Sequence, residues 1–232
     1  MAIIHRTTLT PGTLELLADW LPDQPWYRLG RGPELAKAGG FRLDDPAGDV
    51  GIEFMVVTDG SGDSAVSYLT PLTYRASALA GADGALVGTT EHGVLGRRWV
   101  YDGLADPVLV GQLVALLQGR VQPQAQSVSD TADPTVTCVP VAGGIPLAVE
   151  SAVVADGPLG TELRVDTMGE DGAAGGRLVI TVNRVLRPDP ADPGDGLGDE
   201  AERGRLLAGW RLADGTVVRG CLAAARYTPA SA

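Results

Sequence analysis

The sequence predicts an α+β fold in which a helix packs on an antiparallel sheet and a β-rich antiparallel region follows. Two segments carry helix-capping signals, and many short segments with strand-like patterns are separated by turn signals. Hydrophobic residues make up 44% of the chain but aromatic residues only 5%, so aliphatic side chains must fill the interior. With 232 residues, the chain can form one large domain or two small ones.

The first helix is expected to begin at the N-cap residue Thr10 and to end at Pro22. Pro11 suits the first helical position, because the N–H that it lacks would have no partner there. Apolar residues then recur at helical spacing, at Leu14, Leu17, Ala18 and Leu21. This pattern gives the helix one apolar face that can cover a sheet.

The second helix is expected to begin after Asp106, which is a good N-cap residue. Pro107 takes the first helical position, and residues 108–117 supply an apolar stripe. Gly119 suits the left-handed conformation that commonly follows a helix. Both ends of this helix are therefore marked in the sequence.

Strands are expected on both sides of the second helix. The candidates before it are residues 40–43, 52–58, 65–75, 85–89 and 97–101, and those after it are 135–140, 147–154, 162–167, 177–186, 206–212 and 217–224. Residues 59–63 and 213–216 have the composition of hairpin turns. Residues 187–204 carry three prolines and six acids, which predicts a mobile, solvated loop.

The stretch 121–134 is polar, and we interpret it as a linker between two domains. The first domain comprises residues 1–120 in this interpretation, and the β-rich second domain comprises residues 135–228. The sequence leaves open whether the two pack as one unit.

The net charge of −11 and the scattered basic residues argue against nucleic acid as a partner, because binding to phosphates needs clustered Lys and Arg. No apolar run reaches the ~20 residues that span a bilayer, so no membrane partner is expected. The apolar stretch within residues 1–6 is too short for a signal peptide, which predicts a cytoplasmic protein. Cys138 and Cys221 are then expected to be free and buried.

The residues needed for common catalytic chemistry are missing, so no catalytic residue, metal or cofactor is predicted. His5 and His92 are the only histidines, and they have no identifiable partners for a zinc site. There is no G-x-S-x-G motif, and no Walker A lysine follows the glycine-rich turns. A Glu91–His92 acid–base pair is the alternative, although adjacent residues of an extended chain point to opposite faces.

Trp26 and Tyr27 form an aromatic pair in a loop between prolines and arginines. Such a pair can stack on a sugar or a partner surface, or Trp26 can anchor the loop in the core. Basic residues of the cap are candidates for the same ligand. The candidate ligand- or partner-binding residues are therefore Trp26, Tyr27, Arg28, Arg31, His92, Arg97 and Arg98.

Several motifs carry a family resemblance. They lie at Trp20-Leu21, Gln24-Pro-Trp26-Tyr27, Gly30-Arg31, Tyr68–Tyr74, Val87-Gly-Thr89, Tyr101-Asp102 and Pro107. They are similar to the N-terminal cap of actinobacterial maltokinases, kinases that phosphorylate maltose on the route from trehalose to α-glucan. The chain as a whole resembles short stand-alone actinobacterial proteins with a maltokinase N-terminal cap-like domain. The motifs shared with that group lie at residues 2–9, 40–45, 91–96 and 124–129, and the similarity is specific over residues 1–130.

The resemblance implies a cystatin-like cap, a helix on an antiparallel sheet, followed by the β-rich intermediate part of a kinase N-terminal lobe. It places residues 178–184 where the kinases have the strand with the ATP-contacting lysine. Thr181 stands at that lysine position, and Lys37 is the only lysine of the chain. The catalytic lobe has no counterpart. Because phosphoryl transfer depends on those parts, we do not expect kinase activity.

Two functional hypotheses follow, and a third is held open. The first is a non-catalytic cap-like module of maltose, trehalose, α-glucan or related sugar-kinase metabolism, with a sugar kinase, a glucan-pathway enzyme or a second copy as its partner. The alternative is a protein that binds a sugar or sugar phosphate in a cleft between the cap and the β-rich region. The third is an unrecognised carbohydrate-active enzyme that uses His92 and Glu91.

Overall fold

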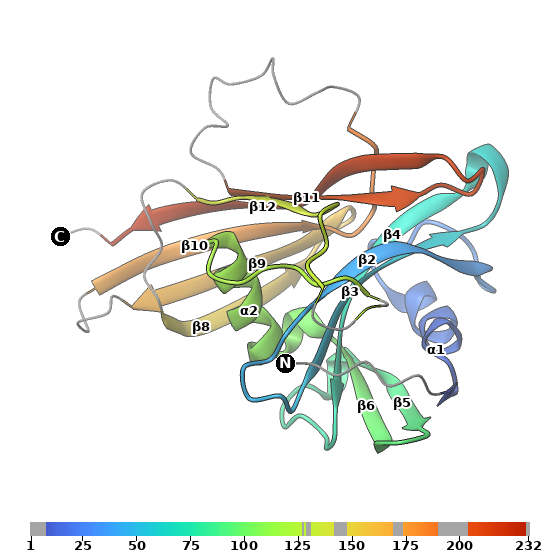
Figure 1. Ribbon diagram of the computed structural model, residues 1–232, viewed down its shortest axis with the longest axis horizontal. Helices are drawn as coiled ribbons and strands as arrows, with labels where there is room; N and C mark the ends of the chain where they lie inside the picture. Colours follow the sequence, from blue (N-terminus) through green and yellow to red (C-terminus); the bar gives the residue numbers. More distant parts are fainter. Residues whose placement is uncertain are drawn as a thin grey trace.

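A computed structural model of the chain describes residues 8–126, 128, 131–141, 148–168, 174–189 and 204–230. Two α-helices and one large sheet dominate this part of the chain (Figure 1). The helices are α1 (Thr13–Trp20) and α2 (Pro107–Leu117). The strands are β1 (Leu9–Thr10), β2 (Leu35–Leu43), β3 (Gly51–Asp59), β4 (Val66–Arg75), β5 (Leu86–His92), β6 (Gly96–Asp102), β7 (Thr137–Val139), β8 (Ala148–Asp156), β9 (Gly160–Met168), β10 (Ala174–Asn183), β11 (Gly204–Arg211) and β12 (Val217–Pro229).

The strands named above pair antiparallel within a single sheet. Their order is β1-β5-β6-β4-β3-β2-β11-β12-β10-β9-β8, and β7 lies off this path beside β11. An antiparallel sheet with two short helices agrees with the α+β class that the sequence predicts. We call β1–β6 with α1 the cap half, and β7–β12 the β-rich half.

The start of the first helix differs from the prediction. Thr10 is the last residue of β1, where it pairs with Glu91 of β5. The helix begins beyond it: Gly12 is the N-cap, and its N–H donates to the Glu15 carboxylate at 2.6 Å. The predicted N-cap at Thr10 is therefore wrong, because strand pairing with β5 takes up this residue. At the other end, α1 leads into a short 3-10 turn that contains Pro22.

The second helix, α2, begins as predicted and is buried on most sides. Asp106 caps it by accepting a hydrogen bond from the Val108 N–H at 2.9 Å, and Gly119 follows it with a φ of 72°. Its buried residues are Leu109, Val110, Leu113, Val114, Ala115, Leu116 and Leu117. A helix that is apolar around most of its circumference belongs in the interior. Accordingly, α2 lies between the sheet of the cap half and the β-rich half (Figure 1).

The sheet of the cap half separates two hydrophobic cores. On one face, α1 and Trp26 pack in a cluster that includes Met55 and Val57 of β3. On the other face, Phe54 and Val56 of the same strand join α2 and the β-rich half in a larger core. Successive side chains of a strand point to opposite faces, so β3 contributes to both cores. The larger core spans the two halves of the chain.

Backbone hydrogen bonds also join the two halves. β2 meets β11 where Gly39 pairs with Trp210. Directly after β10 the chain crosses to β4, and the Leu69 N–H donates to the Arg184 carbonyl at 2.9 Å. Gln124, in the predicted linker, pairs with β2. The pairings therefore form a closed circuit through β4, β3, β2, β11, β12 and β10.

Further expectations concern the cysteines, membrane spans and the acidic loop. Cys138 and Cys221 are free thiols as predicted, but both are half-buried instead of buried. Over the described ranges, no helix is long and apolar enough to cross a membrane. Most of the predicted loop 187–204 lies outside the described residues, as does His5.

Candidate functional site

Trp26 lies in the core of the cap half and is fully buried. Its ring makes an edge contact with Trp20 at a centroid distance of 5.8 Å and a tilted contact with Tyr68 at 5.9 Å. The guanidinium carbon of Arg184 lies 5.0 Å from the centre of the Trp26 ring, within the range of a cation–π interaction. Of the two roles considered for Trp26, this geometry corresponds to an anchor for its loop.

The neighbouring Tyr27 fastens the same loop to the end of β3. Its hydroxyl donates to the Asp59 carboxylate at 2.6 Å, and burial together with Asp59 raises the pKa of Tyr27 far above its usual value. The Arg28 N–H donates to the Tyr68 hydroxyl at 3.1 Å, whereas the Arg28 side chain is exposed. The Arg31 side chain is exposed as well. The loop is thus held by its rings and backbone, with two arginines on its surface.

His92 stands at the end of β5 and shapes the β5–β6 hairpin. Its Nδ1 accepts hydrogen bonds from the Val94 N–H at 3.2 Å and the Leu95 N–H at 3.0 Å. A neutral imidazole with this acceptor carries its proton on Nε2. The turn that His92 holds presents Val94 and Leu95 outward, with 62% and 46% of these residues exposed. The tip of the hairpin is therefore an apolar projection.

Arg97 and Arg98 flank this tip. The Arg97 Nε donates to the Glu91 carboxylate at 2.9 Å, with both side chains exposed. The Arg98 guanidinium donates to the Leu95 carbonyl at 2.7 Å. The Glu91 carboxylate is thus engaged by an arginine on the surface of the hairpin.

The two groups of predicted residues lie at opposite ends of β4. The Trp26 loop packs near its beginning, at Tyr68. The β5–β6 hairpin projects beyond its other end, because Arg75 at the end of β4 pairs with Trp99 and the hairpin turn precedes Trp99. At about 3.4 Å per residue, the groups are roughly 30 Å apart. The structure therefore does not bring together the four arginines expected around one cleft, Arg28, Arg31, Arg97 and Arg98.

Sequence reasoning missed a buried polar cluster where the two halves meet. Arg184, directly after β10, is fully buried, and its Nη2 donates to the Asp102 carboxylate at the end of β6. Its Nε donates to the Thr161 hydroxyl of β9 at 2.8 Å. We call Arg184, Asp102, Thr161 and Trp26 the junction cluster. It ties the cap half to the β-rich half through side chains from four separate parts of the chain.

The charges of the junction cluster depend on one another. Burial raises the pKa of Asp102, and the nearby Arg184 opposes this effect without cancelling it. Breaking a buried ion pair by removing one partner is costly, because the remaining charge has no water around it. These groups are engaged with each other, so the cluster acts as a fixed connection between the halves.

One signal in the sequence could have located Arg184. Leu178, Ile180 and Val182 alternate along β10 and are buried. Arg184 continues this alternation by two positions and points the same way. An arginine at an inward position requires a buried acid, although the alternation alone does not say which one.

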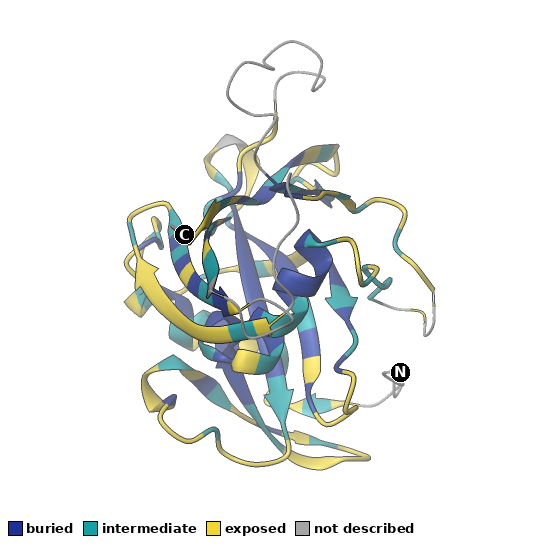
Figure 2. Cartoon of the chain, turned by 90° about the vertical axis from the view of Figure 1, so that its left-hand side faces the viewer, coloured by how far each residue is buried: buried dark blue, intermediate teal, exposed yellow. Residues whose placement is uncertain are grey.

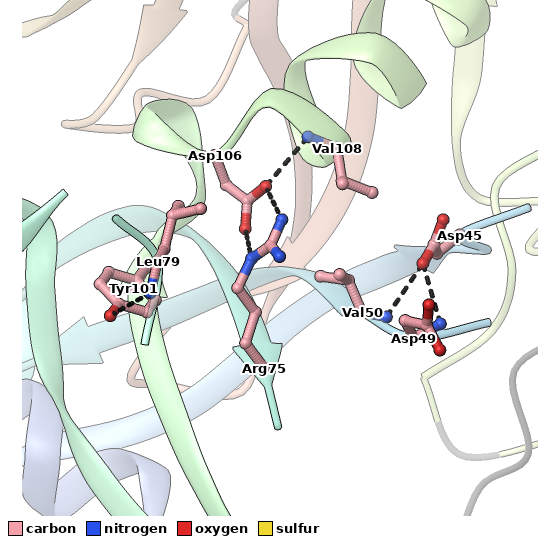
Figure 3. A network of polar contacts seen from close by, with 8 residues as sticks. All are labelled: Asp45, Asp49, Val50, Arg75, Leu79, Tyr101, Asp106 and Val108. Carbon is pink, nitrogen blue, oxygen red and sulfur yellow. Dashed lines mark hydrogen bonds and ion pairs between the residues drawn. The ribbon is translucent and has the colours of Figure 1, made fainter. Parts of the chain in front are cut away.

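A second polar network anchors the N-terminus of α2 (Figure 3). Arg75 at the end of β4 makes two hydrogen bonds of 2.6 Å to the Asp106 carboxylate. Burial pushes the pKa of Asp106 up, but the hydrogen bonds from Arg75 and the Val108 N–H outweigh it, and the pKa is lowered. Nearby, the Asp45 carboxylate accepts from the N–H of Val50 at 3.0 Å and shapes the β2–β3 turn. The network fixes where α2 leaves the sheet.

Two shallow grooves lie in the β-rich half. The first, of about 440 Å³, is lined by Thr135, Gly209, Trp210, Arg211, Val217, Val218 and Arg219. The second, of about 480 Å³, is lined by Leu159, Asn183, Val185, Arg187, Pro188, Asp189 and Cys221. Neither includes a predicted binding residue. Over the described ranges, no group of three or more His, Cys, Asp or Glu side chains is placed to hold a metal ion.

Comparison with known families finds a match within the cap half. Residues 20–106 match the family model of the maltokinase N-terminal cap domain. The matched segment runs from the end of α1 to the N-cap of α2 and contains β2–β6, Trp26 and Asp102. The predicted cap-like domain is therefore confirmed over this segment, which is less than half of the chain. No curated protein matches the chain in sequence.

Proposed function

We propose that the chain is a non-catalytic, cytoplasmic binding module that acts in maltokinase-related sugar metabolism, with a maltokinase or another sugar kinase as its partner. The observation that carries the proposal is the match of residues 20–106 to the maltokinase N-terminal cap domain. In this proposal the cap is cystatin-like, with α1 on the antiparallel sheet. Residues 1–120 form the cap domain, residues 121–134 the linker and residues 135–228 the β-rich domain.

The residues on β10 support a non-catalytic role. Thr181, at the position where the resemblance expects the ATP-contacting lysine, is exposed and carries a hydroxyl that cannot neutralise a phosphate. The cation nearest to it in sequence is Arg184, which points inward and pairs with Asp102. The charge of Arg184 therefore joins the two halves and is not directed to a nucleotide position at Thr181.

The β5–β6 hairpin is the surface that best suits a protein partner. Val94 and Leu95 are exposed apolar side chains at its tip, and Arg97 and Arg98 lie beside them. Apolar anchors with arginine at their border are a common composition of protein interfaces. The Trp26 loop, with Arg28 and Arg31 exposed, offers a second and more polar contact.

Binding to a purified maltokinase tests the proposal, measured by biolayer interferometry with the intact chain. We expect Leu95→Asp to weaken binding at least about tenfold, because it places a charge in the apolar centre of the contact. Val139→Asp is the matched control, since Val139 on β7 of the β-rich half is 45% exposed, close to the 46% of Leu95. No binding by the unmodified chain, or equal binding by the two variants, contradicts the proposal.

A small-ligand function is the second candidate, and the groove beside Trp210 favours it. Exposed arginines Arg211 and Arg219 border this groove, and the buried Trp210 is among its lining residues. Cationic side chains at a groove suit a phosphorylated sugar. Thermal-shift measurements with maltose, maltose 1-phosphate and ATP separate the candidates. A ligand at 100 times its dissociation constant stabilises by ~2.7 kcal/mol. Stabilisation that Arg219→Ala abolishes would favour this candidate.

A further inference from the structure

The two edge strands of the sheet differ in length. At one end lies β1, which comprises Leu9–Thr10 in the part of the chain that the structure describes. At the other end lies β8, which runs over nine residues, Ala148–Asp156, and among the described strands pairs only with β9. A very short edge strand gives another chain little to pair with, whereas a long one offers a row of free N–H and C=O groups.

The outer edge of β8 is exposed and carries apolar side chains. All its residues except Val149 are exposed, and Figure 2 shows it as a long curved strand coloured as exposed over nearly its full length. Val153 and Val154 at its centre are 59% and 39% exposed. Within the described ranges, no strand covers this edge.

The usual protections of an edge are sparse on β8. Its sequence contains no lysine, arginine or proline, and its two charged residues, Glu150 and Asp156, flank the uncharged centre. Charged residues and proline commonly block pairing at an edge. One β-bulge occurs, at the register shift between Val149 and Ser151. From Ser151 to Asp156 the strand is regular and follows β9 residue by residue. This regular stretch is free to receive another strand.

We propose that β8 of one copy pairs antiparallel with β8 of a second copy, so that the two sheets become one continuous sheet across a two-fold axis. A strand that pairs with itself in this way satisfies the symmetry of a closed dimer, because both copies use the same surface. Side chains that face each other must then lie on the same face of the sheet. The axis therefore passes between one residue of β8 and the same residue of the second copy.

Charge selects the position of that axis. An axis at Val153 sets Glu150 against Asp156 of the second copy at both ends of the pairing, and like charges directly opposite are unfavourable. An axis at Val154 sets Asp156 against Ala152 and Val153 against Ala155, all within the regular stretch. The register centred on Val154 avoids both the bulge and any pair of facing acids.

The dimer is expected to be weak and favoured by salt. Pairing one strand per copy buries less than the ~1,200 Å² of a standard stable interface, so association should become visible near about 100 µM. Each copy carries a net charge of −11. Salt screens the repulsion between the copies, so the dimer fraction should be larger at about 0.5 M than at about 0.05 M NaCl.

Sedimentation velocity of the intact chain over a range of concentrations tests the proposal. We expect a concentration-dependent shift from monomer to dimer. Val154→Asp should abolish it, because two carboxylates then face each other on the axis. Val139→Asp, at an exposed valine of β7 with an exposure of 45%, should leave it unchanged. A chain that stays monomeric at all concentrations and both salt levels, or a dimer that both substitutions affect equally, overturns the proposal.

Disulfide cross-linking provides a second test, and it needs only the conservative substitution of a valine by cysteine on the axis. Facing residues of antiparallel strands have Cα atoms about 4.5–5.5 Å apart, which suits a disulfide. Val154→Cys should therefore form a cross-linked dimer under mild oxidation. Val153 is more exposed in the monomer, but in this register it faces Ala155 of the second copy and lies diagonal to the second Val153. Val153→Cys should therefore cross-link far less. Both variants are made in a chain whose free cysteines, Cys138 and Cys221, are replaced by serine. Equal cross-linking of the two variants rules out the register.

Discussion

Two arginine–aspartate pairs of similar composition play different parts in this protein. Arg184 and Asp102 meet at the junction of the halves, with the arginine side chain fully buried. Arg75 and Asp106 meet at the start of α2, with 19% of the arginine side chain exposed. The pKa of Asp102 is raised, mainly because burial disfavours its charged form. The pKa of Asp106 is lowered, because Arg75 and a backbone N–H satisfy its carboxylate.

In both sites burial raises the pKa of the carboxyl and the arginine lowers it, and the lowering effects outweigh burial only at Asp106. Asp106 accepts two hydrogen bonds from Arg75 and one from Val108, and Arg75 keeps contact with solvent. Asp102 accepts one from Arg184, whose side chain is fully buried, and one from the Leu104 N–H. The first pair stabilises a helix end, and the second holds two halves at a large desolvation cost.

The largest expected effect comes from breaking the junction pair. Arg184→Ala leaves Asp102 buried without its cation and removes the guanidinium from the Trp26 ring. We expect a loss of about 3–5 kcal/mol in the free energy of unfolding, measured by urea titration. The matched control is Arg177→Ala, which breaks an exposed pair with Asp166. A loss at Arg184 no larger than that of the control would show that the junction cluster does not stabilise the fold.

Removing the carboxylate at the helix end should have a smaller effect. Asp106→Ala deletes the N-cap of α2 and the partner of Arg75, which can still turn to solvent. We expect a loss of about 2–3 kcal/mol, the sum of a cap and of charge-assisted hydrogen bonds. The helical signal in the far-ultraviolet circular dichroism should survive, since α2 is held by the core. An unchanged urea midpoint would contradict this account.

The dependence of stability on pH should have opposite sign for the two acids. Asp106 has a lowered pKa, so its contribution is present above 3.8, its value in the unfolded chain, and is lost as the pH falls through its folded value. Asp102 has a raised pKa, so its contribution is present below 3.8 and is lost as the pH rises through its folded value.

Two isosteric variants separate these contributions. Between about pH 3 and 6, the stability of the unmodified chain relative to Asp106→Asn should increase with pH, and that relative to Asp102→Asn should decrease. Urea titrations across this range measure both differences. Slopes of the same sign would mean that the two carboxyls have environments of the same kind.

The smallest effect is expected at the surface. Arg97→Ala breaks the pair with Glu91, in which both side chains are more than half exposed. We expect a change of less than about 1 kcal/mol in the free energy of unfolding, because water solvates both charges when the pair is broken. A larger loss would mean that the β5–β6 hairpin depends on this pair.

Local patterns predict much of this fold. Pro107 and Asp106 mark the start of α2, and the strand candidates before and after it overlap the observed strands. The misplaced start of α1 has a tertiary cause, since β5 recruits Thr10. No local signal reports a pairing between residues separated by some eighty positions. Thr10 has the side chain of a good N-cap, but its pairing with Glu91 of β5 moves the start of the helix to Gly12.

The candidate site was harder to predict for the same reason. The sequence drew attention to Trp26, but the side chains that surround it include Tyr68 of β4 and Arg184 directly after β10, which are distant in sequence. The expected convergence of arginines from the Trp26 loop and the β5–β6 hairpin is wrong, because β4 separates them by its length. Alternation along β10 could have indicated that Arg184 points inward, but its acid, Asp102, is identified only in the assembled sheet.

The crossing of the chain from β10 to β4 also has a consequence for biosynthesis. On a ribosome, α2 emerges before any strand of the β-rich half, with its many buried leucines and valines still uncovered. The backbone of β4 near Leu69 must likewise wait for Arg184, more than a hundred residues later in translation. A nascent chain halted near residue 120 would therefore expose an apolar helix and an unpaired strand edge, which are features that chaperones recognise.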